Sequence, residues 1–176
     1  MNGNPSQVFV MTFAENDAYD SHGAGGAVYA GAGAATLAHV TFAGNLANAG
    51  DSLATGAQGT IGVSRSVMDT NLFAGGVCEG SVTSGAYNVV QGEDADCAFA
   101  AGDITGAGED GLGLRALAAN GGPTETFALK GSSQAVNFVP TARCLILTGG
   151  KDQRGFARPA GSKCDAGSYE RGAKKP

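Results

Sequence analysis

Three nine-residue segments of this chain align with one another, at residues 8–16, 37–45 and 63–71. The second segment begins 29 residues after the first, and the third begins 26 residues after the second. A repeat with a period of about 20–50 residues is typical of stacked architectures, in which each copy contacts mainly its neighbours. This repeat therefore restricts the possible folds more than any other feature of the sequence.

Alignment of the three segments produces three columns of matching residues. The columns are Val8, Leu37 and Val63; Phe13, Phe42 and Met68; and Asn16, Asn45 and Asn71. One copy cannot bury its own apolar residues, whereas stacked copies bury them against each other. We predict that the two apolar columns form a core stack. We expect each asparagine to lie in a tight turn, because asparagine tolerates the left-handed conformation.

Within each copy, the residues alternate with a period near two. In the second copy, Val40 and Phe42 are separated by a polar residue, which is typical of a half-buried strand. The alternation is interrupted at Val10, His39 and Arg65, where we predict a bend. Stacked His39 and Arg65 side chains could bind a small anion, but we interpret this position as a solvated bend.

The repeat predicts an all-β fold, a right-handed parallel β-helix (solenoid) of about three to four coils with an irregular C-terminal cap. A β-sandwich is the alternative, but its strands rarely keep columns in register over three copies. Residues 1–97 would form the coils, and the last coil, from Cys78 to Cys97, is less regular. Residues 98–176 would form a basic tail and a region that caps the open end, with a strand at residues 126–129. Both parts would belong to one structural domain.

The chain contains four cysteines, Cys78, Cys97, Cys144 and Cys164. They form no C-x-x-C motif, which disfavours a zinc ribbon or a redox site. Three disulfide pairings are possible, and we predict the local one, Cys78–Cys97 and Cys144–Cys164. Closing a loop of about twenty residues contributes about 3 kcal/mol on the loop-entropy estimate. An even number of widely spaced cysteines also favours an oxidising compartment.

Charge is distributed unevenly along the chain. Residues 1–150 contain four basic and thirteen acidic residues, whereas the remaining residues contain seven basic and three acidic ones. The acidic body disfavours nucleic-acid binding, which needs a basic surface. No segment reaches the roughly 18 consecutive apolar residues of a transmembrane helix. No signal-peptide pattern opens the chain, so we expect a piece of a longer protein.

Several motifs in the second half of the chain resemble those of a known family. Residues 84–90 (SGAYNVV) resemble the element SGGYNLI, residues 113–129 resemble GPLADNGGPTPTHAL, and residues 131–137 are close to GSPAID. Residues 152–159 (DQRGFARP) and 164–170 (CDAGSYE) are similar to DQRGxxRP and CDIGAYE. Together these motifs resemble the choice-of-anchor Q domain, which is related to the β-helices of polymorphic outer-membrane and autotransporter-like proteins.

The resemblance covers roughly residues 75–170. It implies an extracellular or cell-surface bacterial β-helix, usually the distal part of a longer chain, and no defined activity. It also implies that charged residues of the last two motifs form the cap through hydrogen bonds and ion pairs. These residues are Asp152, Arg154, Arg158, Asp165 and Glu170. The chain departs from the family at Arg115, in place of the proline of GPL, and at Asn137, in place of the aspartate of SPAID.

Right-handed β-helices also include polysaccharide lyases and hydrolases, so catalysis has to be considered. The carboxylates Asp51, Asp69 and Glu79 are scattered in the sequence. Asp51 and Asp69 are a conceivable pair for a glycosidase, which needs two carboxylates about 5–9.5 Å apart. The sequence contains no evident nucleophile–base pair. We therefore predict no catalytic residues and no cofactor.

Two acidic clusters, at residues 93–96 and at Asp103 with residues 109–110, could bind calcium through several oxygen ligands. Their spacing matches no EF-hand loop, so we interpret them as acidic surface loops. The histidines and cysteines are too far apart in sequence to indicate a metal site. We therefore predict no metal.

We expect a non-enzymatic structural or adhesive module, such as a unit of a fibre or the end of a longer surface protein. A carbohydrate-binding or carbohydrate-cleaving β-helix is the alternative, although a chain with no tryptophan and four tyrosines offers little surface for sugar stacking. An ice-binding array is a third idea, because Thr12 and Thr41 align, but Val67 ends the row.

The expected partners follow from the short, polar N-terminal segment, which would leave the first coil uncovered. An uncovered coil would be covered by a second copy bound head-to-tail or by upstream coils of a longer chain. A polysaccharide is a further possible partner. Nucleic acid and membrane insertion are not expected.

Overall fold

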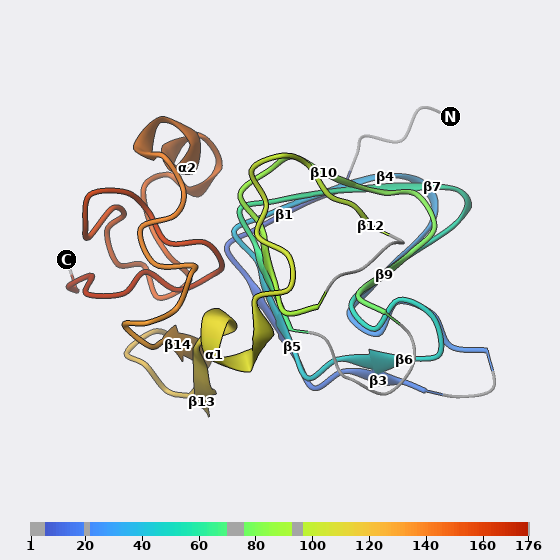
Figure 1. The fold of residues 1–176 in the computed structure, drawn as a ribbon, viewed down its shortest axis with the longest axis horizontal. Coiled ribbons are helices and arrows are strands. Elements are labelled where there is room, and N and C mark those ends of the chain that lie inside the picture. The colour runs from blue at the N-terminus through green and yellow to red at the C-terminus, as the bar shows by residue number, and fades with distance from the viewer. Residues whose placement is uncertain (1–5, 20–21, 70–75, 93–96, 176) are drawn as a thin grey trace.

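The computed structural model of the 176-residue chain describes residues 6–19, 22–69, 76–92 and 97–175. Parallel strands dominate these residues, and the helices among them are short. The predicted all-β class is therefore confirmed. Figure 1 shows the strands stacked on the right-hand side and the C-terminal residues to their left.

Three parallel sheets are built from the first part of the chain. The long sheet contains β1 (Ser6–Phe9), β4 (Val28–Ala38), β7 (Leu53–Ser64), β9 (Cys78–Glu79), β10 (Val82–Ser84) and β12 (Cys97–Ala98). The side sheet contains β2 (Thr12–Ala14), β5 (Thr41–Ala43), β8 (Val67–Met68) and β11 (Val89–Val90). The short sheet contains β3 (Asp17–Ala18) and β6 (Leu46–Ala47).

The chain passes from the long sheet to the side sheet repeatedly, and each pass lies on the previous one as a layer. We number these layers 1 to 5, and they comprise residues 6–18, 24–47, 49–69, 77–91 and 97–107. Every strand pairing between layers is parallel. The side chains of one column therefore point in the same direction in successive layers.

Both predicted apolar columns lie in register across layers 1 to 3. The pairs are Val8–Leu37, Leu37–Val63, Phe13–Phe42 and Phe42–Met68. The rings of Phe13 and Phe42 are stacked within 6° of parallel, with centroids 5.4 Å apart. Leu37 and Phe42 are completely buried. The columns thus form the centre of the main hydrophobic core.

The residues that interrupt the alternation form a sharp corner between the long sheet and the side sheet. Val10, His39 and Arg65 have φ angles of 55°, 55° and 54°, so a left-handed residue occurs at the same place in three layers. The predicted bend is therefore present. The expectation that it is solvated is wrong, because His39 is completely buried and Arg65 is only 9% exposed.

The asparagine column forms a hydrogen-bonded ladder. Asn16 Nδ2 donates to Asn45 Oδ1 at 2.7 Å, and Asn45 Nδ2 donates to the carbonyl oxygen of Phe13 at 3.1 Å. The left-handed residues are the preceding ones, Glu15 (φ 55°) and Gly44 (φ 68°). The asparagines therefore follow the turn and connect layers, which corrects the predicted role. Asn71 lies outside the described residues.

The layers continue beyond Cys97, where the sequence analysis expected the repeat to be lost. Cys97 of β12 pairs with Val82 of β10, and Ile104 bridges to Val89 of β11. Layer 5 is short and lacks the apolar columns, so its sequence does not resemble the other copies. Side-chain contacts replace those columns in part, since Asp103 accepts hydrogen bonds from the backbone and side chain of layer 4.

The C-terminal region, residues 108–175, follows layer 5. Its elements are α1 (Gly108–Leu112), β13 (Leu114–Ala118), β14 (Thr126–Leu129) and α2 (Thr141–Thr148). β13 and β14 form an antiparallel hairpin. The strand predicted at residues 126–129 is present as β14, whereas α2 was not anticipated.

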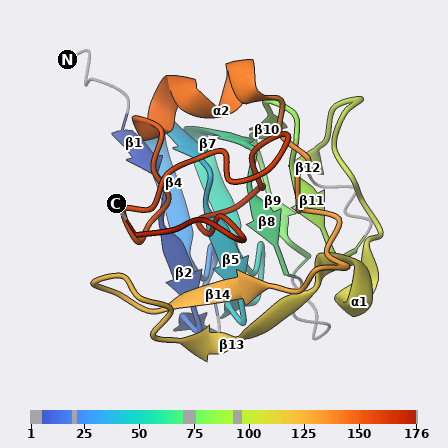
Figure 2. The same ribbon diagram turned by 90° about the vertical axis from the view of Figure 1, so that its left-hand side faces the viewer.

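The C-terminal region covers the outer face of the side sheet and not an end of the layers. Figure 2 shows the hairpin and the C-terminal chain lying across β2, β5 and β8. The prediction of a cap over the open end is therefore wrong. The physical reason is that the outward residues Val67 and Val89 are apolar, and they are fully buried in a second core with Leu129, Val139 and Ala166.

Both predicted disulfides are present. Cys78 pairs with Cys97 between layers 4 and 5, and Cys144 of α2 pairs with Cys164 of the C-terminal chain. None of the four cysteines is free. Two disulfides in a chain of this length are typical of proteins in an oxidising, extracellular environment.

The core stack generates a stability prediction. Phe42→Ala should lower the free energy of unfolding by about 3–5 kcal/mol, because it removes the middle of a buried column. Chemical denaturation would measure the loss. Tyr19→Ala is the matched control, since Tyr19 is 55% exposed and should change stability by less than about 0.5 kcal/mol. A loss below about 1 kcal/mol for Phe42→Ala would contradict the assignment.

Candidate functional site

The charged residues of the C-terminal motifs gather at the contact between the C-terminal region and the side sheet. They are Asp152, Arg154, Arg158, Asp165 and Glu170, and all of them are buried. Each lies in an irregular segment after α2, so tertiary contacts hold it in place. Buried charges are stable only when they are paired and hydrogen-bonded. The contacts of each residue therefore decide whether any of them is free to act on a ligand.

Arg154 is fully engaged within the C-terminal region. Its Nη2 lies 2.6 Å from Asp152 Oδ2, its Nε donates to the same oxygen at 2.9 Å, and a further bond from Nη2 reaches the Glu170 carbonyl oxygen at 2.7 Å. The guanidinium carbon lies 4.3 Å from the ring centre of Phe156 and 3.7 Å from that of Tyr169. This ion pair therefore stabilises the loop and leaves no free charge.

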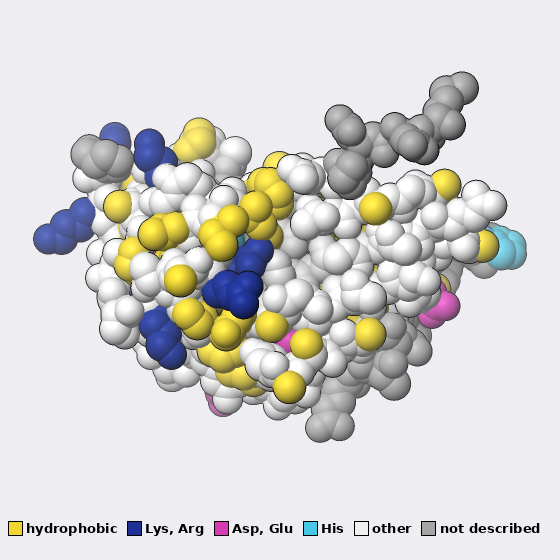
Figure 3. Space-filling model, turned by 90° about the horizontal axis from the view of Figure 1, so that it is seen from above, with side chains coloured by type: hydrophobic (Ala, Val, Ile, Leu, Met, Phe, Trp, Pro, Cys, Tyr) yellow, Lys and Arg dark blue, Asp and Glu magenta, His cyan; other side chains and the backbone are white. Residues whose placement is uncertain are grey.

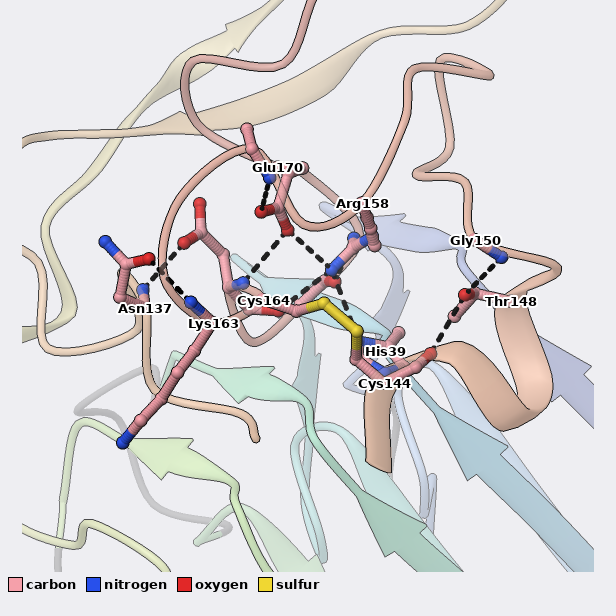
Figure 4. Close-up of a disulfide and its surroundings, with 12 residues drawn as sticks. His39, Asn137, Cys144, Thr148, Gly150, Arg158, Lys163, Cys164 and Glu170 are labelled. Carbon is pink, nitrogen blue, oxygen red and sulfur yellow. Dashed lines mark hydrogen bonds and ion pairs between the residues drawn. A yellow bond between two sulfur atoms is a disulfide. The ribbon is translucent and has the colours of Figure 1, made fainter. Parts of the chain in front are cut away.

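Arg158 and Glu170 form the second ion pair of this cluster, with Nη1 and Oε2 3.4 Å apart. Arg158 also donates to the carbonyl oxygens of Asp165 at 2.8 Å and Gly167 at 2.7 Å. Glu170 accepts hydrogen bonds from the backbone N–H groups of Ala160 and Asp165, each at 2.9 Å. Figure 4 shows this network beside the Cys144–Cys164 disulfide.

His39 connects this ionic cluster to the layers. Arg158 Nη1 lies 3.3 Å from His39 Nδ1, and Figure 4 shows the two side chains facing each other. Burial, together with the positive charges of Arg158 and Arg65, lowers the pKa of His39 to about 2. A neutral imidazole accepts at Nδ1 when Nε2 carries the proton, which assigns the tautomer. His39 is therefore neutral at every physiological pH.

Polar contacts attach the C-terminal region to the outer row of the side sheet. Ser168 N donates to Thr41 Oγ1 at 3.0 Å, and Thr12 Oγ1 donates to Gln153 Oε1 at 2.6 Å. Thr41 and Val67 of the Thr12–Thr41–Val67 row are buried and Thr12 is half-buried, so the row offers no continuous exposed face for ice. The ice-binding idea is thus excluded for this row.

A glycine that the sequence analysis did not single out permits this contact. Gly167 has a φ of 85°, and a Cβ added there would lie 2.7 Å from Thr41 Oγ1 and 3.0 Å from Val67 Cγ2. Only glycine allows both this backbone conformation and this close approach. The CDAGSYE motif therefore supports packing, and its glycine is the signal that could have indicated a buried contact.

A pocket of about 300 Å³ lies where the side sheet meets α1 and the hairpin. Its lining includes the carboxylates Asp69 and Glu109 and the cations Arg115 and Lys130, with Phe127 among its apolar residues. Burial raises the pKa of Asp69 to about 6, and the negative charge of Glu109 adds to the effect. The pocket thus combines a carboxyl group that titrates near neutrality with two cations.

The structure does not bring the sequence-predicted carboxylates together. Asp51 is completely buried and accepts a hydrogen bond from the Ala47 N–H at 3.0 Å, and it does not line the pocket of Asp69. The partner of Asp69 is instead Glu109, more than thirty residues later, which no sequence pattern indicated. Asp103 is engaged by Ser84 and the backbone of layer 4, so it serves the fold.

No group of three or more potential metal ligands occurs among the residues that the structure describes. The acidic cluster at residues 93–96 lies outside them. Within the same described ranges, neither α1 nor α2 has the length and hydropathy of a membrane-crossing helix. Searches against family models, curated proteins and solved structures find no match to this chain.

The low pKa of His39 generates a prediction about acid stability. The folded-state pKa of about 2 lies below the unfolded value of about 6.5, so the unfolded chain binds more protons between these values. The contribution of His39 is fully present above about pH 6.5 and is lost as the pH falls toward 2. His39→Gln should therefore flatten the dependence of unfolding free energy on pH between about 6.5 and 4, measured by urea melts.

The matched control for this measurement is His22→Gln, because His22 is exposed. It should keep the wild-type slope, because His39 is intact in this variant. An identical slope in wild type and His39→Gln would contradict the assignment of a neutral, buried imidazole.

Proposed function

We propose that the chain is a right-handed parallel β-helix module with a non-enzymatic structural or adhesive role, outside the cell or at the bacterial cell surface. The observation that carries this proposal is the register of the layers. Inward residues of the same kind stack over successive layers, and every layer pairing is parallel. Crossover connections between parallel strands are right-handed in about 98% of cases, which supports the proposed hand.

The environment of the charged motif residues supports a structural role for the C-terminal region. Arg154 and Arg158 are held by carboxylates and carbonyl oxygens inside the protein. Removing one partner of a buried ion pair typically destabilises a protein by about 3–5 kcal/mol. The motifs therefore fit a structural role, in which their ion pairs hold the C-terminal region against the side of the layers. Two disulfides are consistent with a location outside the cytoplasm.

The proposed partner is a second copy of this chain, bound head-to-tail. The long sheet begins with β1 and ends with β12, and among the residues that the structure describes each of these strands is paired on one side only. Edge strands present unpaired N–H and C=O groups that accept another strand. A contact between two unlike ends does not close as a dimer, and it propagates as a filament.

A pocket lies at the β1 end, where an added layer would pack. It measures about 480 Å³ and is lined by layer 1 residues, including Met11 and Phe13, and by Leu117 and Glu125 of the C-terminal region. Met11 is 43% exposed, which is unusual for a large apolar side chain beside the core. The C-terminal region thus forms a wall beside the first layer, against which a strand of the second copy would lie.

Sedimentation velocity over a range of concentrations tests this assembly. The wild type should associate, and Met11→Lys should weaken association at least about tenfold, because a buried unpaired charge disfavours the contact. Ile146→Lys is the control, since Ile146 is 68% exposed on α2 and does not line this pocket.

A stable monomer at high concentration, with the amides of layer 1 protected from hydrogen exchange, would contradict assembly through this edge. Upstream coils of a longer chain would then be the remaining candidate to pair with the β1 edge. Fractionation of the producing cells tests the location separately, and recovery of the protein in the cytoplasm with free thiols would contradict it.

A carbohydrate-binding or carbohydrate-cleaving role is the second candidate, and one observation favours it. The pocket of Asp69 and Glu109 holds a carboxyl group whose pKa is raised to about 6 by burial and by the second carboxylate. A protonated carboxylic acid near neutral pH is what a general acid requires, and a paired carboxylate completes the minimal glycosidase arrangement. Arg115 and Lys130 would favour an acidic sugar such as a uronate.

Reducing-end and unsaturated-product assays on uronic-acid and neutral polysaccharides separate the two functions. The structural proposal expects no turnover by the purified protein. Turnover that is lost in both Asp69→Asn and Glu109→Gln, but kept in Asp110→Asn, would establish the second function instead. Asp110 is the control because it is exposed on α1 beside Glu109 and does not line the pocket.

A further inference from the structure

Arg65 is a buried cation without a counter-ion at the corner of layer 3. Its backbone N–H donates to the Ala86 carbonyl oxygen at 3.0 Å, its carbonyl oxygen accepts from the Gly167 N–H at 2.8 Å, and the residue as a whole is only 9% exposed. The Nε atom is buried without a hydrogen-bond partner. Over the described parts of the chain, the guanidinium group donates no hydrogen bond and has no carboxylate within ion-pair distance.

The groups near Arg65 increase this imbalance of charge. Burial lowers the pKa of Arg65, and the positive charge of Arg143 on α2 lowers it further. Arg143 is exposed and forms no ion pair with any described carboxylate. His39 holds the same corner position in layer 2, and its buried Nε2 also lacks a partner. Figure 3 shows Lys and Arg side chains among hydrophobic ones over the C-terminal half and the adjoining layers, and few acidic ones.

A buried charge normally has a partner, because moving an unpaired ion out of water costs several kcal/mol even after relaxation. The other buried arginines of this chain follow that rule, since Arg154 and Arg158 are each paired with a carboxylate. Arg65 breaks it, and a like charge lies nearby. An external anion would compensate the unpaired charge of Arg65 and reduce its repulsion by Arg143.

We propose that Arg65 and Arg143 form a binding site for an oxyanion group, such as a sulfate, phosphate or carboxylate, at the seam between the layer 3 corner and α2. Guanidinium groups match the planar or tetrahedral oxygens of these anions with paired N–H donors. The site does not depend on the function proposed above.

The net charge of −5 has a consequence for this site. The field of the whole protein repels anions at long range, so binding has to come from local contacts with the two guanidinium groups. Binding should then persist at moderate ionic strength, because partly buried charges are screened less than exposed ones.

Thermal unfolding in sodium sulfate and in sodium chloride at equal ionic strength tests the proposal. Sulfate stabilises many proteins by exclusion, so the measured quantity is the difference between variants. The sulfate-specific increase in Tm should be larger in the wild type than in Arg65→Gln by about 3 °C at ten times the Kd. Arg143→Gln should lose most of the same increase, and it should fold, because Arg143 is exposed.

Arg171→Gln is the charge-matched control, since Arg171 is an exposed arginine of the same region. It should keep the wild-type response to sulfate. In the absence of an oxyanion, Arg65→Gln should be at least as stable as the wild type, because it removes an uncompensated charge. An equal sulfate response in wild type, Arg65→Gln and Arg143→Gln would overturn the proposal.

A second titration distinguishes the source of the oxyanion. Heparin, a sulfated polysaccharide, is compared with neutral dextran and with inorganic sulfate by calorimetry. Heparin binding that Arg65→Gln and Arg143→Gln abolish would support an acidic glycan as the source, and a response to inorganic sulfate alone would support a small free anion. Binding of heparin that neither substitution weakens, without any sulfate response, would overturn the site.

Discussion

Parallel pairing in register between successive layers is the interaction on which the rest of this structure depends. It places Phe13, Phe42 and Met68 above one another, so that each buries the next. It also places the left-handed corner residues of layers 1 to 3 above one another, because these layers turn at the same position. A shift of one residue would exchange inward and outward side chains, which fixes the register strongly.

The same register explains why the outer face of the side sheet needs a cover. In a strand, residues alternate between the two faces, so Val67 and Val89 point away from the main core while Met68 and Val90 point into it. Apolar residues on the outward face would otherwise contact water. The C-terminal region buries them in a second core, and its two internal ion pairs hold the irregular chain in the required shape.

The sequence predicted those features that repeat, and it missed those that arise from contacts between distant segments. Matching columns indicated parallel layers, and local pairing of the four cysteines, which closes two loops of similar size, led to the correct disulfides. Nothing local indicated that the C-terminal region would pack on the side sheet, because the decisive residues, such as Gly167 and Thr41, are 126 positions apart. The burial of His39 and the pairing of Asp69 with Glu109 depend on the same packing and were missed for the same reason.

The C-terminal region contacts several layers at once, and this has a consequence for how the molecule opens. Thr12 of layer 1 and Thr41 of layer 2 both bond to Ser168, and Val67 and Val89 of layers 3 and 4 share its apolar core. Stacked repeats usually fray one at a time from their ends, since each contacts only its neighbours. Here the C-terminal region contacts four layers at once, so the loss of one layer also removes contacts that hold the others. We therefore expect the layers to unfold cooperatively and not one at a time from an end.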